Sequence, residues 1–162
     1  MSEATVRARI KAVLEAVSGI GTVHDYRRWF INDEGLHTLY TTSSVLNAWI
    51  ISLVNYTQEY LDYGEDAGQK RQVLRTYTYR IECIYALKDS SATEKTVAAI
   101  AEDVGEALDG NDDLHDETNY YNKTPPCQLD VFEHILFMGK LCHHVQFSLK
   151  VAETVAIAAN QL

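Results

Sequence analysis

Two segments of the chain place apolar residues three and four positions apart, which is the spacing of one face of a helix. The first covers residues 3–17, and Gly19 follows it where a helix end favours a left-handed residue. The second starts at Ser90 or Ser91 and ends near residue 108, before Gly110. The two apolar stripes consist of Val6, Ile10, Val13, Leu14 and Val17, and of Val97, Ile100, Ala101, Val104 and Leu108. We therefore predict two amphipathic helices.

Other segments have the alternation or the composition of β-strands. Residues 45–61 are rich in β-branched and aromatic side chains, and residues 128–137 and 141–153 predict two strands around a turn at 138–140. Residues 22–29 predict one short strand. Residues 73–87 alternate most clearly. One face holds Tyr77, Tyr79, Ile81, Cys83, Tyr85 and Leu87, and the other holds Thr76, Thr78, Arg80 and Glu82.

The remaining segments connect these elements. Residues 33–43 predict a short helix with Leu36, Leu39 and Tyr40 inward, and residues 62–72 predict a hairpin loop that is acidic first and basic afterwards. Residues 109–126 predict a solvated acidic connection, and residues 154–162 a flexible tail. The order indicates a single α+β domain over residues 1–162. We expect a mainly antiparallel sheet of about four to five strands with two helices packed on one face.

Charge and cysteine content narrow the function classes. The chain has 162 residues and a formal net charge of −9 at pH 7, so non-specific binding to nucleic acid is not expected. Its three cysteines have no CxxC or zinc spacing, which favours a reducing compartment. The N-terminal segment is not typical of a signal peptide, and no apolar run reaches the roughly 20 residues that span a bilayer.

Two short motifs each contain some, but not all, of the residues that a nucleotide-binding or catalytic site requires. Gly19-Ile20-Gly21 follows a helix, lacks a third glycine and has no GK[ST], so it predicts a helix end and a turn. His24 and Asp25 are adjacent, and adjacent strand residues point to opposite faces, so they are not expected to act on one atom. We predict no catalytic residue and no cofactor.

Cys142-His143-His144 is the strongest candidate for metal-ligating chemistry. Alternation places Cys142 and His144 on one face of a strand and His143 on the apolar face. Two ligands are fewer than zinc requires, unless His134 on the preceding strand joins them. A small metal-dependent hydrolase that uses His134, Cys142 and His144 is therefore one alternative. The other is a buried His143 beside an exposed His144, with no metal.

Residues 26–30 combine the residue types that are enriched at protein–protein hot spots: Tyr26, Arg27, Arg28, Trp29 and Phe30. The two aromatic residues at 29 and 30 are equally compatible with the core. In so acidic a chain, the two arginines are expected to reach a carboxylate of a partner. We therefore predict a docking edge at these positions.

The order of elements and several short motifs resemble the tail terminator, or tail completion, proteins of long-tailed bacteriophages. These proteins are small α+β domains similar in fold to the lambda tail terminator, and the resemblance covers about residues 3–153 as an architecture. The motifs are Gly19-Ile20-Gly21 followed by Val23-His24-x-Tyr26-x-Arg28, then Ala48-Trp49-Ile50, and finally Leu141-Cys142-His143-His144-Val145-Gln146-Phe147 with Leu149-x-Val151.

The resemblance implies a structural virion protein at the tail–neck junction, assembled in the host cytoplasm, and not an enzyme. It implies a homo-oligomeric ring, usually a hexamer, that caps the head-proximal end of the tail tube and joins it to the neck or connector. The tail tube protein, the neck (head completion) protein and, in a contractile tail, the sheath are then its partners. Genome DNA passes through such a ring without specific binding.

A ring that closes on itself needs two different patches on each copy. We place one patch on Arg27 and Arg28, facing acidic residues of the next copy at 109–117 or between Glu59 and Asp66. The loop at 62–72 is the predicted contact to the tube or neck. The residues assigned to this second region are Glu59, Asp62, Glu65, Asp66, Lys70 and Arg71. Another head–tail joining (neck or stopper) ring and a dimeric α+β binding domain remain alternatives.

Overall fold

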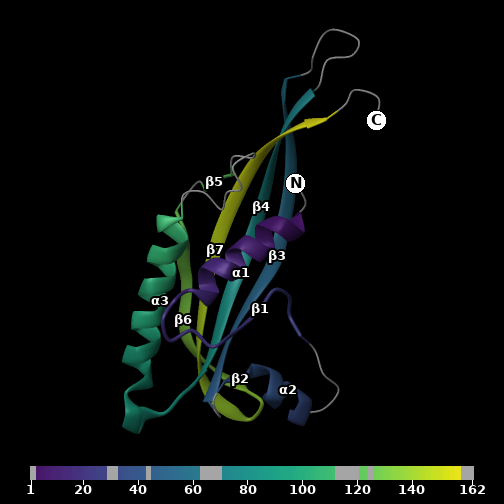
Figure 1. The fold of residues 1–162 in the computed structure, drawn as a ribbon. Coiled ribbons are helices and arrows are strands. Elements are labelled where there is room, and N and C mark those ends of the chain that lie inside the picture. The colour runs from purple at the N-terminus through teal and green to yellow at the C-terminus, as the bar shows by residue number, and fades with distance from the viewer. Residues whose placement is uncertain are drawn as a thin grey trace.

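The computed structural model describes residues 3–28, 33–42, 45–62, 71–111, 121–123 and 126–157. Figure 1 shows its elements in chain order. The helices are α1 (Glu3–Glu15), α2 (Asp33–Tyr40), the 3₁₀ turn η1 (Asp89–Ser91) and α3 (Thr93–Gly110). The strands are β1 (Thr22–His24), β2 (Thr41–Thr42), β3 (Val45–Asp62), β4 (Arg71–Ala86), β5 (Tyr121–Lys123), β6 (Gln128–Phe137) and β7 (Lys140–Ile157).

Three long strands form the centre of the sheet. β3 and β7 both pair antiparallel with β4, which lies between them. The main path of the sheet runs β1-β3-β4-β7-β5, while β2 pairs with β3 and β6 pairs with β7. β1 is parallel to β3, with Val23 opposite Trp49. The predicted α+β class and mainly antiparallel sheet are confirmed.

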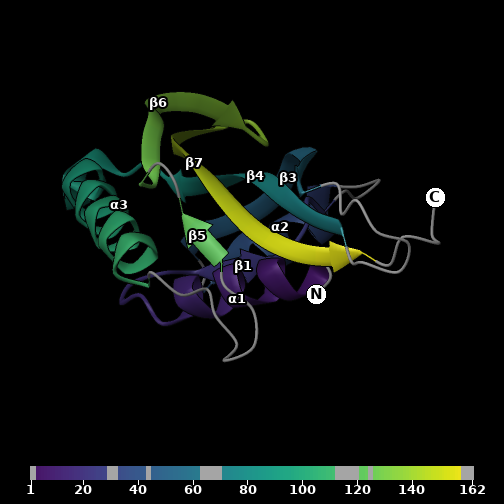
Figure 2. The ribbon, with the colours of Figure 1, turned by 90° about the horizontal axis from the view of Figure 1, so that it is seen from above.

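The larger core lies between one face of this sheet and the helices α1 and α3. Seen along the strands, both helices lie on the same side of the sheet (Figure 2). All five residues of the predicted α3 stripe are buried, as are Val6, Ile10 and Leu14 of α1. Their partners on the sheet include Trp49, Tyr79, Ile81, Phe147 and Leu149. The predicted packing of two helices on one face is therefore confirmed.

A smaller core covers part of the opposite face. There Tyr40 of α2 packs with Ile50, Ile84 and Cys142, and Phe137 of β6 contacts the Tyr40 ring at 5.5 Å between centroids. The short helix predicted at 33–43 is present as α2, with Tyr40 buried and Leu39 half-buried. Its third predicted inward residue, Leu36, has a side chain outside the described part.

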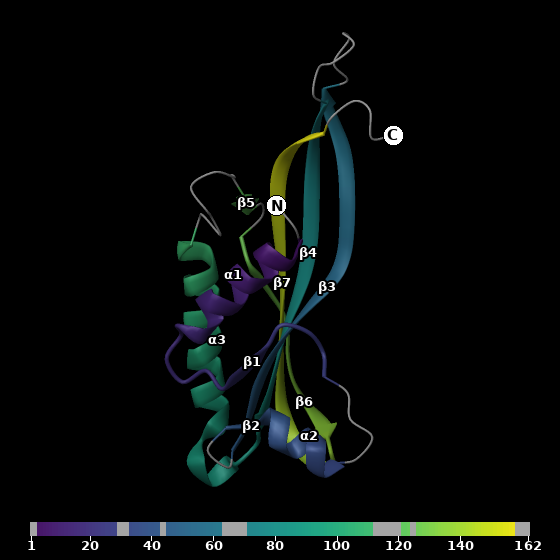
Figure 3. The same cartoon turned by 45° about the vertical axis from the view of Figure 1, so that its right-hand side comes forward.

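Beyond α1 the central strands continue as a slender arm (Figure 3). We define the arm as residues 53–62 of β3, 71–79 of β4 and 149–157 of β7, which pair across their length. Among the described residues no helix covers the outer end of the arm in Figures 1 and 3. The inner part of the arm still contributes Tyr77, Tyr79, Leu149 and Val151 to the larger core, whereas its β3 strand exposes Leu53, Val54, Tyr56, Tyr60 and Leu61.

The structure corrects several boundaries. The hairpin loop predicted at 62–72 is shorter, because Asp62 is the last residue of β3 and β4 already begins at Arg71. The strand predicted at 22–29 ends at His24, and Gly110 is the last residue of α3 instead of following it. The connection predicted at 109–126 contains β5, which pairs with β7. Residues 154–157 of the predicted tail form the end of β7 and pair with the start of β4. The reason is that Val155 and Ile157 continue the alternation of apolar residues along β7. Residues 158–162 lie outside the described part.

Candidate interaction surfaces and the Glu82 cluster

The segment from Gly19 to Arg28 is held by hydrogen bonds to its own chain. Gly19 has φ +79°, the left-handed conformation predicted at the helix end. The Asn47 side-chain amide donates to the Gly19 carbonyl at 3.0 Å, and Arg7 donates to the Asp25 carbonyl at 2.7 Å. His24 is buried, with Nε2 3.1 Å from the Leu39 carbonyl. Its burial lowers its pKa, so the ring is neutral near pH 7.

Arg27 has a carboxylate partner inside the chain. Its guanidinium pairs with Glu82, a residue of β4 whose exposed fraction is only 7%. The carboxylate that Arg27 reaches in this structure thus belongs to its own chain, and its use at an interface stays a prediction. Arg28 lies over the Tyr26 ring, 5.0 Å from its centroid, and its carbonyl accepts a hydrogen bond from Tyr40 at 3.0 Å. These contacts give residues 26–28 a role in holding α2 near the sheet.

Glu82 also faces His144 of β7, and this contact was not foreseen. Nε2 of His144 is 3.6 Å from Glu82, and Nδ1 is 3.1 Å from Glu133 of β6. His144 and then Arg27 lower the pKa of Glu82 against its burial, while Glu82 raises the pKa of His144. Alternation placed Glu82 on the polar face of its strand, with Thr76, Thr78 and Arg80. Its burial could have been predicted from its position, because Glu82 is the one acidic residue within the apolar stretch Ile81–Ala86.

The cluster borders a pocket of about 250 Å³ on the smaller core. Ile50, Ile84, Ile135 and Phe137 line its apolar part, and the Arg27–Glu82–His144 group lies at its polar part. The charges of this group are paired with each other. The Glu82 carboxylate therefore links the segment between β1 and α2 to β4 and β7, and His144 extends the link to Glu133 of β6.

The histidines do not come together with Cys142 as a metal site would require. His134 is opposite His143 in the β6–β7 register, with ring centroids 5.0 Å apart, whereas Cys142 and His144 point to the other face. His143 is buried, with Nε2 3.0 Å from the Thr93 hydroxyl. Within the described ranges no group of three or more His, Cys, Asp or Glu residues could hold a metal ion. The trio His134, Cys142 and His144 is thus split between two faces.

The arm separates the second set of predicted interface residues from the first. Glu59 is exposed near the outer end of β3, whereas Arg27 lies beside β4 at Glu82. Glu59 is opposite Leu74, eight positions from Glu82 along β4, which is about 26 Å. The two sets are therefore distinct patches. Predicted residues that fall outside the described part are Trp29, Phe30, Glu65, Asp66 and Lys70, together with the side chains of Asp62 and Arg71.

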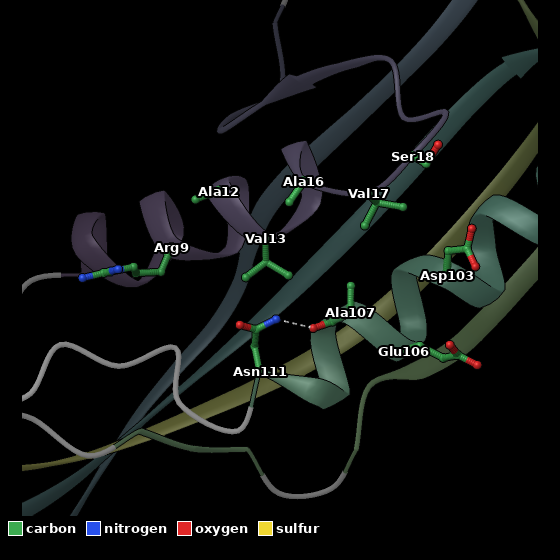
Figure 4. Close-up of a pocket in the computed structure, with 10 residues that line it drawn as sticks. All are labelled: Arg9, Ala12, Val13, Ala16, Val17, Ser18, Asp103, Glu106, Ala107 and Asn111. Atoms are coloured by element: carbon green, nitrogen blue, oxygen red, sulfur yellow. Dashed lines mark hydrogen bonds between the residues drawn. The ribbon is translucent and has the colours of Figure 1, made fainter.

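Two further hollows flank α3. One, of about 620 Å³, lies between α1 and α3 (Figure 4). In that view Arg9 is at one end, Asp103 and Glu106 are at the other, and small residues lie between them, so the polar groups do not converge. The other, of about 290 Å³, lies between α3 and β6 and is mainly apolar. It is lined by Ala98, Ala101, Glu102, Gly105, Cys127, Leu129, Phe132 and Phe147.

Comparison with protein-family models and with curated proteins finds no significant match to this chain. No helix among the described residues is both long and apolar enough to cross a membrane. The functional assignment therefore depends on the surfaces described above.

Proposed function

We propose that the protein is a structural component of a bacteriophage virion that forms a ring at the tail–neck junction. In this role it is a tail terminator: the ring caps the head-proximal end of the tail tube, ends tube polymerisation and offers a different surface to the neck or connector. It acts through binding and not through catalysis. Genome DNA passes through the centre of the ring.

One observation carries the proposal: the molecule combines a helix-covered body with an arm that exposes apolar residues. Leu53, Val54, Tyr56, Tyr60 and Leu61 of β3 are all at least partly open to solvent, and a second exposed apolar group lies on β6. Large apolar patches on a soluble protein mark interaction sites. Two different patches on one chain meet the requirement of a head-to-tail contact, and such contacts generate rings when the rotation closes.

Capping requires that the two ends of the ring differ. A terminator must bind the open end of the tube and present a surface that does not accept another tube ring. The arm and the body supply chemically distinct ends: a thin sheet at one, and helices with an acidic surface at the other. This asymmetry supports a terminator, because a ring with equivalent ends would allow tube growth to continue.

The test is to measure the native mass of the purified protein over a wide concentration range, and then to add it to purified tail tubes. We expect closed rings, six copies each, and binding at one tube end that stops elongation in the presence of excess tube protein. Negative-stain images would locate the ring. A stable twofold dimer that leaves tube length unchanged would overturn the proposal.

A further inference from the structure

The pocket beside the Glu82 cluster combines apolar walls with converging polar groups. We call it the α2 pocket, because Tyr40 of α2 forms one of its walls. α2 and the turn between β6 and β7 lie at the end of the sheet opposite the arm (Figure 3). An apolar pocket with a few converging polar groups is the usual form of a small-molecule site. The other apolar walls are Ile50 of β3, Ile84 of β4, and Ile135 and Phe137 of β6.

The aromatic wall of the α2 pocket is held in place by the protein itself. The Tyr40 ring packs against the rings of His24 and Phe137, at 5.2 and 5.5 Å between centroids. The Tyr40 hydroxyl donates a hydrogen bond to the Arg28 carbonyl at 3.0 Å. A site whose walls are already ordered loses little conformational entropy when a ligand binds. The α2 pocket is therefore preorganised for a ligand.

The volume of the α2 pocket limits the size of such a ligand. The volume is about 250 Å³, which exceeds the roughly 150 Å³ of an apolar cavity that binds benzene. Sites that enclose drug-sized molecules are larger, at roughly 300–1,000 Å³. One aromatic ring, or a branched aliphatic group of similar size, with a short polar chain matches this space.

The carboxylate of the cluster already has cationic partners in its own chain. Glu82 pairs with Arg27, and Nε2 of His144 lies 3.6 Å from the same carboxylate. His144 and Arg27 lower the pKa of Glu82, so this residue is ionised near pH 7. A cationic ligand would have to compete with both partners for Glu82. The cluster therefore does not favour a ligand amine.

Arg28 supplies the positive charge that a ligand can use. It lines the α2 pocket, and its guanidinium lies over the Tyr26 ring, 5.0 Å from the centroid. Among the described side chains no carboxylate pairs with Arg28. Contact with an aromatic face leaves guanidinium N–H donors available, and these match the two oxygens of a carboxylate. With Arg27 paired to Glu82, the lining keeps one positive charge, which favours an anionic ligand.

We propose that the α2 pocket binds a small organic carboxylate whose apolar body is an aromatic ring or a branched aliphatic group. The apolar body lies against Tyr40, Ile84 and Ile135, and the carboxylate accepts hydrogen bonds from Arg28. This inference goes beyond the proposed function and does not depend on it, because the purified protein alone is sufficient for binding. Tail tubes are therefore absent from its test.

The first test compares three probes that have the same ring and chain but different charge: phenylpropionate, phenylpropanol and phenylpropylamine. Titrations of the full chain followed by NMR should show that phenylpropionate binds at least tenfold more tightly than the amine, with the alcohol between them. Equal affinities for the three probes would overturn the proposal. No binding of phenylpropionate at about 10 mM would overturn it as well.

The isoleucine methyl signals locate the bound probe. In protein labelled at these methyl groups, phenylpropionate should shift the signals of Ile50, Ile84 and Ile135, which line the α2 pocket. Ile51 and Ile81 are internal controls, because both belong to the larger core on the other face of the sheet. Shifts of equal size at the control residues would place the probe elsewhere and contradict the assignment.

Two substitutions separate the charged contact from the apolar one. Arg28→Gln keeps the backbone carbonyl that Tyr40 binds, so it should weaken phenylpropionate at least tenfold and leave the affinity for phenylpropanol nearly unchanged. Arg9→Gln is the matched control, since it removes an exposed arginine of α1 that lines a different pocket, and it should change neither affinity. Undiminished binding of phenylpropionate to Arg28→Gln would reject the charged contact.

Ile135→Trp should fill the α2 pocket and abolish binding of both phenylpropionate and phenylpropanol, because Ile135 is a half-buried wall residue. Its melting temperature shows whether the variant is folded. Ile135→Phe adds less volume and serves as the second variant, with an expected loss of affinity of at least tenfold. Full binding by a folded variant at this position would show that the probe does not occupy the α2 pocket.

Discussion

Gly21 lies where the backbone before β1 passes close to the backbone of β3 at Asn47. A Cβ at this position would lie 1.9 Å from the Asn47 carbonyl oxygen, a backbone atom that cannot move away alone. We therefore expect Gly21→Ala to lower the free energy of unfolding by about 2 kcal/mol or more, because relief of the clash displaces β1 from β3. Urea denaturation followed by circular dichroism measures this change.

The matched control is Gly105→Ala, where the added Cβ meets open space within α3. Alanine is preferred over glycine inside a helix, so this variant should raise the free energy of unfolding by about 0.5–1 kcal/mol. Equal effects of the two substitutions would show that Gly21 is not limited by contact with Asn47. The glycine pair in the sequence is thus explained by packing and by the turn after α1.

Glu153 is a second residue whose role is decided by burial. It is 1% exposed, accepts a hydrogen bond from Tyr77 at 2.7 Å, and lies 3.8 Å from Arg75. We expect Glu153→Ala to cost about 3 kcal/mol of unfolding free energy, because Arg75 loses its partner while it stays partly buried. Tyr77→Phe removes one hydrogen bond and should cost about 1 kcal/mol. Equilibrium denaturation of both variants tests the order, and an equal cost would contradict it.

At the scale of elements, the Glu82 cluster ties β4, β6 and β7 together in a pH-dependent way. The pKa of His144 is raised above 6.5, so its contribution to stability is complete below that value and is lost as the pH rises through the raised pKa. The pKa of Glu82 is lowered below 4.5, so its contribution is complete above 4.5 and is lost as the pH falls through the lowered value. The cluster therefore stabilises the fold most between these two reference values.

His144→Gln should consequently reduce stability more at about pH 5.5 than at about pH 9, with a difference on the order of 1 kcal/mol. Free energies of unfolding in urea, measured for wild type and variant at both pH values, check this expectation. Glu133→Gln should have a smaller effect, because the Glu133 side chain is largely exposed. A cost of His144→Gln that does not vary with pH would show that the ion pair contributes nothing.

The elements themselves were largely predictable because each buries one regular stripe. The α3 stripe and the alternating residues of β4 follow directly from periodicity, and both are confirmed. The Glu82 cluster was not predictable, since it joins residues that are 11 to 62 positions apart through the β6–β7 register and the return of the chain after β1. The short β5 strand was missed for a related reason: it has too few residues to show a period, and its place depends on β7.

At the scale of the whole molecule, we expect the outer part of the arm to serve the proposed assembly and to contribute little to folding. This part adds little to the two cores, whose residues lie mainly level with the helices α1, α2 and α3. Replacement of residues 63–70 by a two-residue Asn-Gly turn closes the β3–β4 hairpin with a favoured geometry. The cores should therefore fold unchanged in this variant.

We expect the shortened arm to leave the melting temperature within about 3 °C of wild type, while binding to purified tail tubes falls at least tenfold. The physical reason is that Asp62 and Arg71, which this segment joins, end β3 and begin β4, and that none of the residues in either core cluster lies next to them in sequence. Co-sedimentation with tubes measures binding, and a scrambled 63–70 segment of equal length provides the control. The scrambled loop should bind as weakly as the deletion if its side chains make the contact, whereas normal binding by the shortened arm would assign the tube contact to the helical body.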